Sequence, residues 1–453
     1  MSVLKFLKKD KENENATTEK HYLSGKEVRE IAKANAKEMR RLEKAKKLKV
    51  PESAYLTQMS DKGNILEVED LHSYFFTDQG VVKAVNGVTF NIPCNSTVGV
   101  VGESGCGKSV TSMSIMRLLQ GPSGQIVNGS IRFKINDYKR NEKGEAIPIY
   151  ETDENGEIVM EEVLDKNGNK KLDANGNPIM QPKQKLDAHG ISMFEMEDKV
   201  YDIAKMPIRE MYRLRGRQMS MVFQEPMTSL NPVFTIGNQL DEVTLLHIPG
   251  ATKELAKKRS IEMLNLVGIA MPERVYASFP HELSGGMRQR VMIAMALAGE
   301  PRLIIADEPT TALDVTIQAQ ILDLFNDLKH KINSSILLIT HDLGVIAEMA
   351  DYVVVMYAGR IIEQGTASEI FHNPCHPYTQ GLQKSKPTMK SKDKLFNIPG
   401  NVPNPINMPN NCYFKERCSQ CIGKCSGDYP GMVQVSPTHF VACHLYEENK
   451  QEE

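Results

Sequence analysis

The chain has 453 residues, which is enough for two or three domains, and 41% apolar and 25% charged residues are typical of a soluble globular protein. Its formal net charge of −2 gives no overall attraction to nucleic acid, so we expect no nucleic-acid partner. No apolar run approaches 18 residues, and the N-terminal apolar stretch is too short for a secretory signal. These features predict a cytoplasmic chain without a membrane-spanning helix.

Residues 1–60 form a charged N-terminal extension. Residues 26–48 could form a charged helix, which Pro51 would stop. We expect a solvated extension, and attraction to an anionic membrane surface is the alternative.

A series of short strands begins at Ile65, over residues 65–68, 81–85 and 88–92. The β-branched run 96–101 follows, then the pattern G-x-x-x-x-G-K-S, then a helix predicted over 110–119. In such a loop the backbone N–H groups surround phosphate oxygens, Lys108 reaches the outer phosphates and the Ser109 hydroxyl binds Mg²⁺. The loop predicts ATP binding through Gly102, Ser104, Gly105, Cys106, Gly107, Lys108, Ser109 and Val110.

An insertion over about 137–205 follows a strand predicted at 130–135. It contains Asn-Gly pairs at 155–156, 167–168 and 175–176, which favour type I′ hairpin turns. A calcium-binding loop would need a later Gly and a closing Glu, so we expect surface hairpins instead.

Two adjacent carboxylates end a second buried strand, predicted over 303–307. Asp307 would hold Mg²⁺ through its water shell, and Glu308 could polarise a water that attacks the γ-phosphate. Ordinary surface charge is the alternative, but adjacent carboxylates at the end of an apolar strand are uncommon.

Residues 283–290 supply a second phosphate-binding edge, because Ser284, Gly285 and Gly286 precede an apolar helix. The ordered set resembles the ATP-binding cassette (ABC) ATPase family over about residues 65–365. The resemblance implies a RecA-like α/β core, an antiparallel β subdomain and a helical subdomain around residues 225–290.

The resemblance also implies individual roles. Gln224 matches the glutamine that reaches Mg²⁺, and His341 matches the histidine that contacts the γ-phosphate. With Glu308, these two residues form the implied catalytic set. Asp314 matches the loop that crosses the dimer interface. Phe75 matches the aromatic residue that stacks on adenine, with Tyr74 and Phe76 as close alternatives.

Several segments resemble one subfamily, the oligopeptide/dipeptide permease ATPases: residues 223–232, 376–379 and 398–400, and a cysteine pattern near the C-terminus. The resemblance implies a metal centre, either a [4Fe–4S] cluster or zinc, and Cys421 could replace one ligand. Free buried thiols are the alternative. The implied ligands are Cys412, Cys418, Cys425 and Cys443.

The resemblance therefore implies a peripheral ATPase at the cytoplasmic face of the membrane that energises oligopeptide or dipeptide uptake. Two transmembrane permease subunits, a second ATPase subunit in a heterodimer and an extracytoplasmic peptide-binding protein would be its partners. An importer for nickel or another small solute is the first alternative, and a soluble ABC ATPase is the second. The expected domains are the extension 1–60, an ATPase domain over 61–365 and a cysteine domain over 366–453. The long extension and the insertion depart from the usual shape of the subfamily.

Overall fold

A computed structural model describes residues 24–165, 169–173, 175–186, 190, 192–225, 229–248, 250–311, 315–331, 333–385 and 396–447. In this part of the chain no helix is both long and apolar enough to cross a bilayer.

The predicted charged helix is present as α2 (Gly25–Lys46). Ser24 begins it with a capping box, in which its hydroxyl accepts from the Glu27 N–H and the Glu27 carboxylate accepts from the Ser24 N–H. The helix does not stand free in solvent, because it packs on the first sheet and Asn35 donates to the Thr77 carbonyl at 2.7 Å. The expectation of a solvated extension is therefore wrong for this helix.

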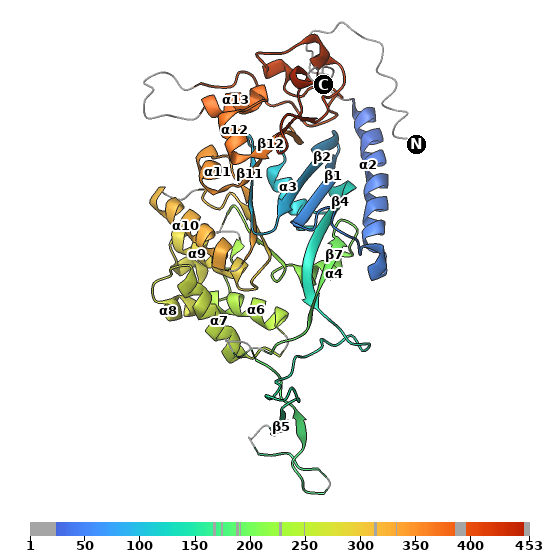
Figure 1. Ribbon diagram of the computed structural model, residues 1–453. Coiled ribbons are helices and arrows are strands. Elements are labelled where there is room, and N and C mark those ends of the chain that lie inside the picture. The colour runs from blue at the N-terminus through green and yellow to red at the C-terminus, as the bar shows by residue number, and fades with distance from the viewer. Residues whose placement is uncertain are drawn as a thin grey trace.

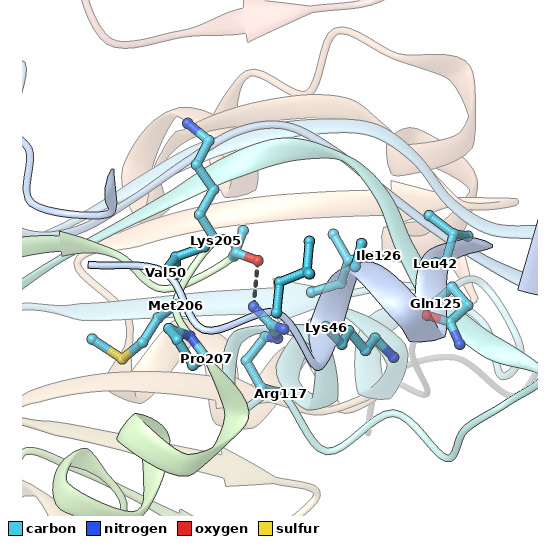
Figure 2. A pocket seen from close by; sticks show the side chains of 12 residues that line it. Leu42, Lys46, Val50, Arg117, Gln125, Ile126, Lys205, Met206 and Pro207 are labelled. Atoms are coloured by element: carbon cyan, nitrogen blue, oxygen red, sulfur yellow. Dashed lines mark hydrogen bonds between the residues drawn. The ribbon is translucent and has the colours of Figure 1, made fainter. Parts of the chain in front are cut away.

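A groove of about 240 Å³ lies between the end of α2 and the neighbouring loops (Figure 2). The Arg117 guanidinium lies in it and donates to the Ile203 carbonyl at 2.6 Å. Its lining combines apolar and basic side chains, namely Leu42, Ala45, Lys46, Leu48, Val50, Arg117, Gln125, Ile126, Ala204, Lys205, Met206 and Pro207.

The first sheet is antiparallel, in the order β2-β1-β4-β7. The strands predicted at 81–85 and 88–92 are one continuous strand, because irregular pairing with β1 absorbs the left-handed Gly87 (φ 79°). The strands are β1 (Asn64–Thr77), β2 (Gly80–Pro93), β4 (Gly124–Tyr138) and β7 (Met196–Asp202).

The second sheet has eight strands in the order β13-β14-β12-β11-β3-β10-β9-β8, and its pairs from β11 to β8 are parallel. Alternate residues enter two different cores: Leu303 and Ile305 face the first sheet, and Ile304 faces the helices. Apolar burial on both faces explains the unbroken apolar runs in the sequence. The strands are β3 (Thr97–Val101), β8 (Met219–Val222), β9 (Leu303–Asp307), β10 (Ser335–Ile339), β11 (Tyr352–Tyr357), β12 (Arg360–Thr366), β13 (Val433–Gln434) and β14 (Phe440–Val441).

Helices cover the other face of this sheet, and α6 to α8 pack together and against α9, where the helical subdomain is expected (Figure 1). The helix after the phosphate loop ends at Ile115, not at 119, because Arg117 takes a left-handed conformation (φ 54°). The helices are α3 (Lys108–Ile115), α4 (Ile208–Leu214), α6 (Ile236–His247), α7 (Lys253–Leu266), α8 (Pro272–Ala277), α9 (Gly285–Leu297), α10 (Val315–Lys331), α11 (Leu343–Met349), α12 (Ala367–His372) and α13 (Pro377–Lys384).

The described residues between 139 and 195 project from the ends of β4 and β7 as a thin stalk, which includes β5 (Met160–Glu162) and β6 (Met180–Pro182) (Figure 1). Hairpins are present, but the Asn-Gly pairs that the structure describes do not form the predicted type I′ turns. Gly156 takes a positive φ of 84° and Asn155 does not, whereas a type I′ turn requires both. The Asp153 side chain instead accepts from the N–H groups of Asn155 and Glu157, which fixes a type I turn followed by a left-handed glycine.

The same hydrogen bonds recur between Asp173 and residues 175–177, and also at 141–145, where the sequence has no Asn-Gly pair. The pair at 167–168 lies outside the described residues.

Candidate active site

The phosphate loop joins β3 to α3. A Cβ at Gly107 would lie 2.3 Å from the Ala84 carbonyl oxygen, so the loop packs against β2 and only glycine fits there. The Lys108 side chain is buried, and its ammonium group donates to the carbonyls of Gly102 at 2.7 Å and Glu103 at 3.2 Å. The cation is thus held across the loop by weak neutral acceptors that phosphate oxygens could replace.

Two predicted magnesium ligands meet at the end of β9. The Ser109 hydroxyl donates to Asp307 Oδ1 at 3.0 Å, and Ser112 donates to Asp307 Oδ2 at 3.4 Å. Burial raises the pKa of Asp307, the Ser109 hydrogen bond opposes that rise, and the charge of Glu308 adds to it. Among the described residues, no Lys, Arg or His forms an ion pair with the Asp307 carboxylate. This buried carboxylate and the Ser109 hydroxyl are therefore suitable ligands for Mg²⁺.

The three residues predicted to act in catalysis converge on one carboxylate. Glu308 Oε2 accepts from the Gln224 amide at 2.9 Å, and His341 Nδ1 lies 3.4 Å from Glu308 Oε1. Glu308 also accepts from Thr311 at 2.9 Å, and its own φ of 48° is unusual for a residue other than glycine. This conformation turns the side chain out of the buried strand and towards Gln224 and His341.

The second phosphate-binding edge is built as expected but does not join the first. Ser284 caps α9 by accepting from the Met287 N–H at 3.3 Å, and both Ser284 and Gly285 are exposed. Among the described residues, no hydrogen bond connects residues 284–286 to the phosphate loop. This chain therefore leaves its α9 edge open, and Asp314 lies outside the described residues.

The predicted adenine-stacking residue lies on β1. Phe75 is half-buried, and its ring lies against Gly124, where a Cβ would come within 2.9 Å of the ring. Phe76 is buried at 8% exposure, and the Tyr74 hydroxyl donates to Asn86 at 2.9 Å. Of the three aromatic residues, Phe75 best fits the role of stacking on adenine, because Phe76 is buried and the Tyr74 hydroxyl is bound to Asn86. This assignment stays a prediction.

Sequence reasoning missed two residues that hold the phosphate loop from the C-terminal side. Arg417 binds the Glu103 carboxylate through two hydrogen bonds, of 2.7 and 3.0 Å. The Tyr378 hydroxyl accepts from the Glu103 N–H at 2.9 Å. Position 378 lies in the His-Pro-Tyr-Thr motif, so the motif offered a signal for Tyr378, but nothing in the local sequence pairs Arg417 with Glu103.

The cysteines of the predicted metal centre are close enough to influence one another. Burial and then the charges of Cys425, Cys443 and Cys418 raise the pKa of Cys412 to about 11. Burial raises the pKa of Cys443 to about 11 in the same way. Cys421 is exposed, and Cys418 Sγ accepts from the Gln420 N–H at 3.4 Å.

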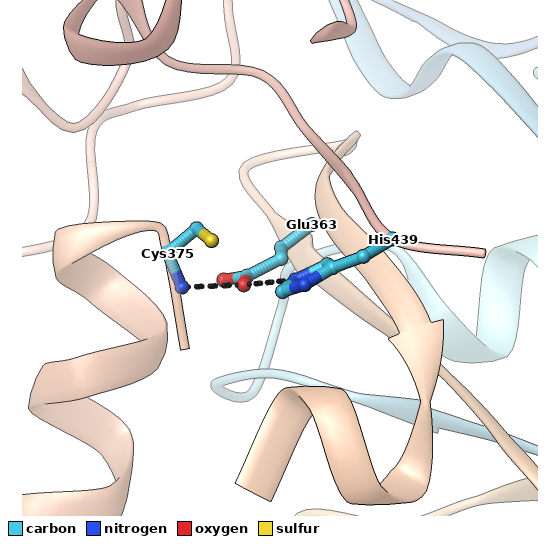
Figure 3. A group of neighbouring side chains, drawn as sticks. All are labelled: Glu363, Cys375 and His439. Atoms are coloured by element: carbon cyan, nitrogen blue, oxygen red, sulfur yellow. Dashed lines mark hydrogen bonds and ion pairs between the residues drawn. The ribbon is translucent and has the colours of Figure 1, made fainter. Parts of the chain in front are cut away.

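A different group of side chains, outside this cysteine cluster, has the spacing of a metal site (Figure 3). Among the described residues, it is the one group of three Asp, Glu, His or Cys side chains whose ligand atoms all lie within 4.8 Å of one another. It consists of Glu363, Cys375 and His439. The Glu363 carboxylate already accepts from the N–H groups of Cys375 at 2.6 Å and His376 at 2.9 Å, and it lies 2.8 Å from His439 Nε2. These bonds make the group a structural junction between β12 and the C-terminal segment.

Two family models match the chain. The model described as ABC transporter matches residues 85–206 and 190–311, in two parts that overlap over residues 190–206. The model described as oligopeptide/dipeptide transporter, C-terminal region, matches residues 362–425.

Known relatives extend the similarity to most of the chain. The oligopeptide transport ATP-binding protein AppD of Bacillus subtilis is 42% identical over 390 residues, covering 86% of this chain and 99% of that protein. OppD of the same organism, also an oligopeptide transport ATP-binding protein, is 44% identical over 383 residues, covering 84% and 88%. Among solved structures, the dimeric MJ0796, a bacterial ABC transporter cassette, is 21% identical with a TM-score of 0.47, covering 67% of this chain and 98% of that chain.

Proposed function

Because the chain belongs to the ABC transporter ATP-binding proteins of the oligopeptide/dipeptide type, we propose that it hydrolyses ATP to drive peptide uptake through separate membrane subunits. Relatives at 40–44% identity include proteins named for oligopeptide and for dipeptide transport. No observation on this chain favours nickel or another small solute, or a role outside transport.

The observation that carries the proposal is the convergence of Gln224 and His341 on Glu308, one residue beyond Asp307. The loop amides and Lys108 would bind the phosphates of ATP. Ser109, Asp307 and Gln224 would hold Mg²⁺, which neutralises phosphate charge when it is bound. Glu308 would then accept a proton from the attacking water, and His341 would contact the γ-phosphate.

We infer the protein partners of this chain from its exposed second phosphate-binding edge. The exposed Ser284 edge supports a second ATPase subunit, whose nucleotide Ser284, Gly285, Gly286 and Asp314 would complete. We expect a heterodimer, bound to two transmembrane permease subunits at the cytoplasmic face of the membrane. An extracytoplasmic peptide-binding protein would deliver the peptide.

We also propose that Cys412, Cys418, Cys425 and Cys443 hold a metal centre. A zinc ion with Zn–S bonds of about 2.3 Å keeps its sulfurs about 3.8 Å apart. No three described thiols have their sulfur atoms within 4.8 Å of one another. Cys425 and Cys443 are buried, Cys412 and Cys418 are partly buried, and four neighbouring thiols suit either a [4Fe–4S] cluster or zinc.

Glu308→Gln tests the proposed mechanism in the purified full-length chain. The amide keeps the shape of the side chain and cannot take the proton, so we expect turnover to fall by about 10²-fold or more while ATP affinity stays unchanged. The measurements are ATP hydrolysis and equilibrium binding of ATP. Glu348→Gln, at an exposed position on α11, is the matched control and should keep both. Turnover near that of the unchanged chain would refute the assignment of Glu308.

A further inference from the structure

The stalk is held together without a hydrophobic core. None of its described residues is buried. Its backbone instead forms closed rings of three hydrogen bonds, as where Val163 donates to Ile179, Ile179 to Lys171 and Lys171 to Val163, at 2.8, 2.9 and 2.8 Å. Equivalent rings join residues 139, 147 and 195, residues 149, 185 and 193, and residues 151, 159 and 183. The stalk is therefore an ordered three-sided stem whose side chains point outwards.

Large apolar side chains cover much of this stem. Single exposed apolar residues are common on protein surfaces, but seven of the 22 found in the described chain lie within these 57 residues. With no core for them to fill, they are available to a partner. They are Ile158, Met160, Leu164, Leu172, Ile179, Met180 and Leu186, each between 41% and 57% exposed.

The stalk also carries an acidic hairpin. Residues 139–195 contain 12 acidic and 8 basic residues, and six of the acidic residues lie in 151–162, which has no basic residue. Lys183 pairs with Glu151 and Lys170 with Glu162. Within the described chain, Glu154 and Glu157 have no ion-pair partner, so the tip of this hairpin combines negative charge with the exposed Ile158 and Met160.

The base of the stalk is fixed to the residues that lead into β8. The Arg217 guanidinium lies 3.7 Å from the centre of the Tyr138 ring, which packs edge-on against Phe194 at 5.3 Å. The buried Gln218 side chain exchanges two hydrogen bonds with the Asn136 backbone, at 2.7 and 3.1 Å. Residues 217–218 lead directly into β8, which ends two residues before Gln224.

From this arrangement we propose that hairpin 151–162 docks onto a basic, amphipathic cytoplasmic segment of the transmembrane subunits. The inference rests on the proposed function, which supplies those subunits. Cytoplasmic loops of membrane proteins are enriched in Lys and Arg, so they complement an acidic, apolar hairpin. An anionic lipid surface repels the same hairpin, and so does the equivalent acidic hairpin of a second copy of this chain.

Photo-crosslinking in the assembled transporter tests this contact. A benzophenone amino acid replaces Ile158 in the full-length chain, which is co-expressed with its transmembrane subunits in membrane vesicles. The control position is Tyr212, which is 65% exposed on α4 and lies outside the stalk. We expect a crosslink from position 158 to a transmembrane subunit and none from position 212.

Charge reversal gives the second arm of the test. Glu154→Lys with Glu157→Lys should reduce that crosslink by roughly fivefold or more, because it places like charges opposite one another. Lys171→Glu, outside hairpin 151–162, should leave it unchanged. Crosslinks only to lipid or to a second ATPase chain, or no crosslink in an assembled complex that hydrolyses ATP, would overturn the docking proposal alone. If the unchanged chain does not assemble with these subunits at all, the proposed function fails and the docking proposal fails with it.

Discussion

Individual residues of the nucleotide site divide into those set by local motifs and those set by distant pairing. Lys108, Ser109, Asp307 and Glu308 each belong to a short pattern whose chemistry can be stated from sequence alone, and the structure brings them together. Arg417 belongs to no such pattern. It contacts a residue 314 positions away, and only the folded chain shows why it matters.

Arg417 should position the phosphate loop for ATP. Its side chain is buried, and Glu103 raises its pKa through hydrogen bonds that fix the second residue of the loop. We expect Arg417→Met to weaken ATP binding about tenfold, because Glu103 would lose its bidentate partner. Arg417→Lys should recover only part of that loss, since an ammonium group cannot form both bonds with the same geometry.

A double-mutant cycle with Glu103→Gln separates positioning from general destabilisation. The two changes should couple by about 0.5–3 kcal/mol in ATP binding measured by calorimetry. Arg213→Met, which removes a half-exposed arginine on α4, is the control and should not change ATP affinity. Additive effects of the Arg417 and Glu103 changes would show that their ion pair does not act on the nucleotide site.

At the scale of elements, apolar pattern located the strands well and predicted their limits poorly. β9 and β10 are where their apolar runs lie, because a parallel strand buried on both faces must be apolar throughout. The predicted turn type was wrong for the described Asn-Gly pairs, because Asp153 and Asp173 bind the turn backbone through their side chains. The ring pairing of its segments joins residues up to 56 positions apart, and no local pattern encodes it.

The C-terminal segment is joined to the larger sheet through β12 and β14, so its cysteines lie on a scaffold that the ATPase fold itself supplies. We expect anaerobically purified protein to contain iron and acid-labile sulfide, measured by metal and sulfide analysis. Zinc alone would support the alternative, and absence of any metal would defeat both.

Serine substitutions identify the ligands. Cys418→Ser should lose the metal, because it removes one of the four proposed thiolates. Cys421→Ser should retain it if the exposed Cys421 is not a ligand. Cys94→Ser, outside the cluster, is the matched control, and loss of metal from this variant would mean that the measurement reports unfolding rather than ligation.

In the whole molecule, the two phosphate-binding edges of one chain do not form a single nucleotide site, which supports the proposed second ATPase subunit. The α3 edge adjoins Asp307 and Glu308, whereas the α9 edge is exposed and makes no hydrogen bond to the phosphate loop among the described residues. α2 and the stalk enlarge the molecule at two further places (Figure 1). We accordingly predict that hydrolysis is coupled to partners, and that the isolated chain shows only part of the activity.

Peptide-stimulated ATP turnover in proteoliposomes tests whether hydrolysis at Glu308 powers peptide transport. The full chain, its sister ATPase, the transmembrane subunits and the peptide-binding protein are reconstituted together, with peptide or a nickel salt offered outside. We predict that peptide stimulates hydrolysis and is taken up, that nickel does neither, and that Glu308→Gln in this chain strongly reduces both responses while ATP still binds. Stimulation by nickel instead of peptide, or peptide uptake at the normal rate in the Glu308→Gln complex, would contradict the account.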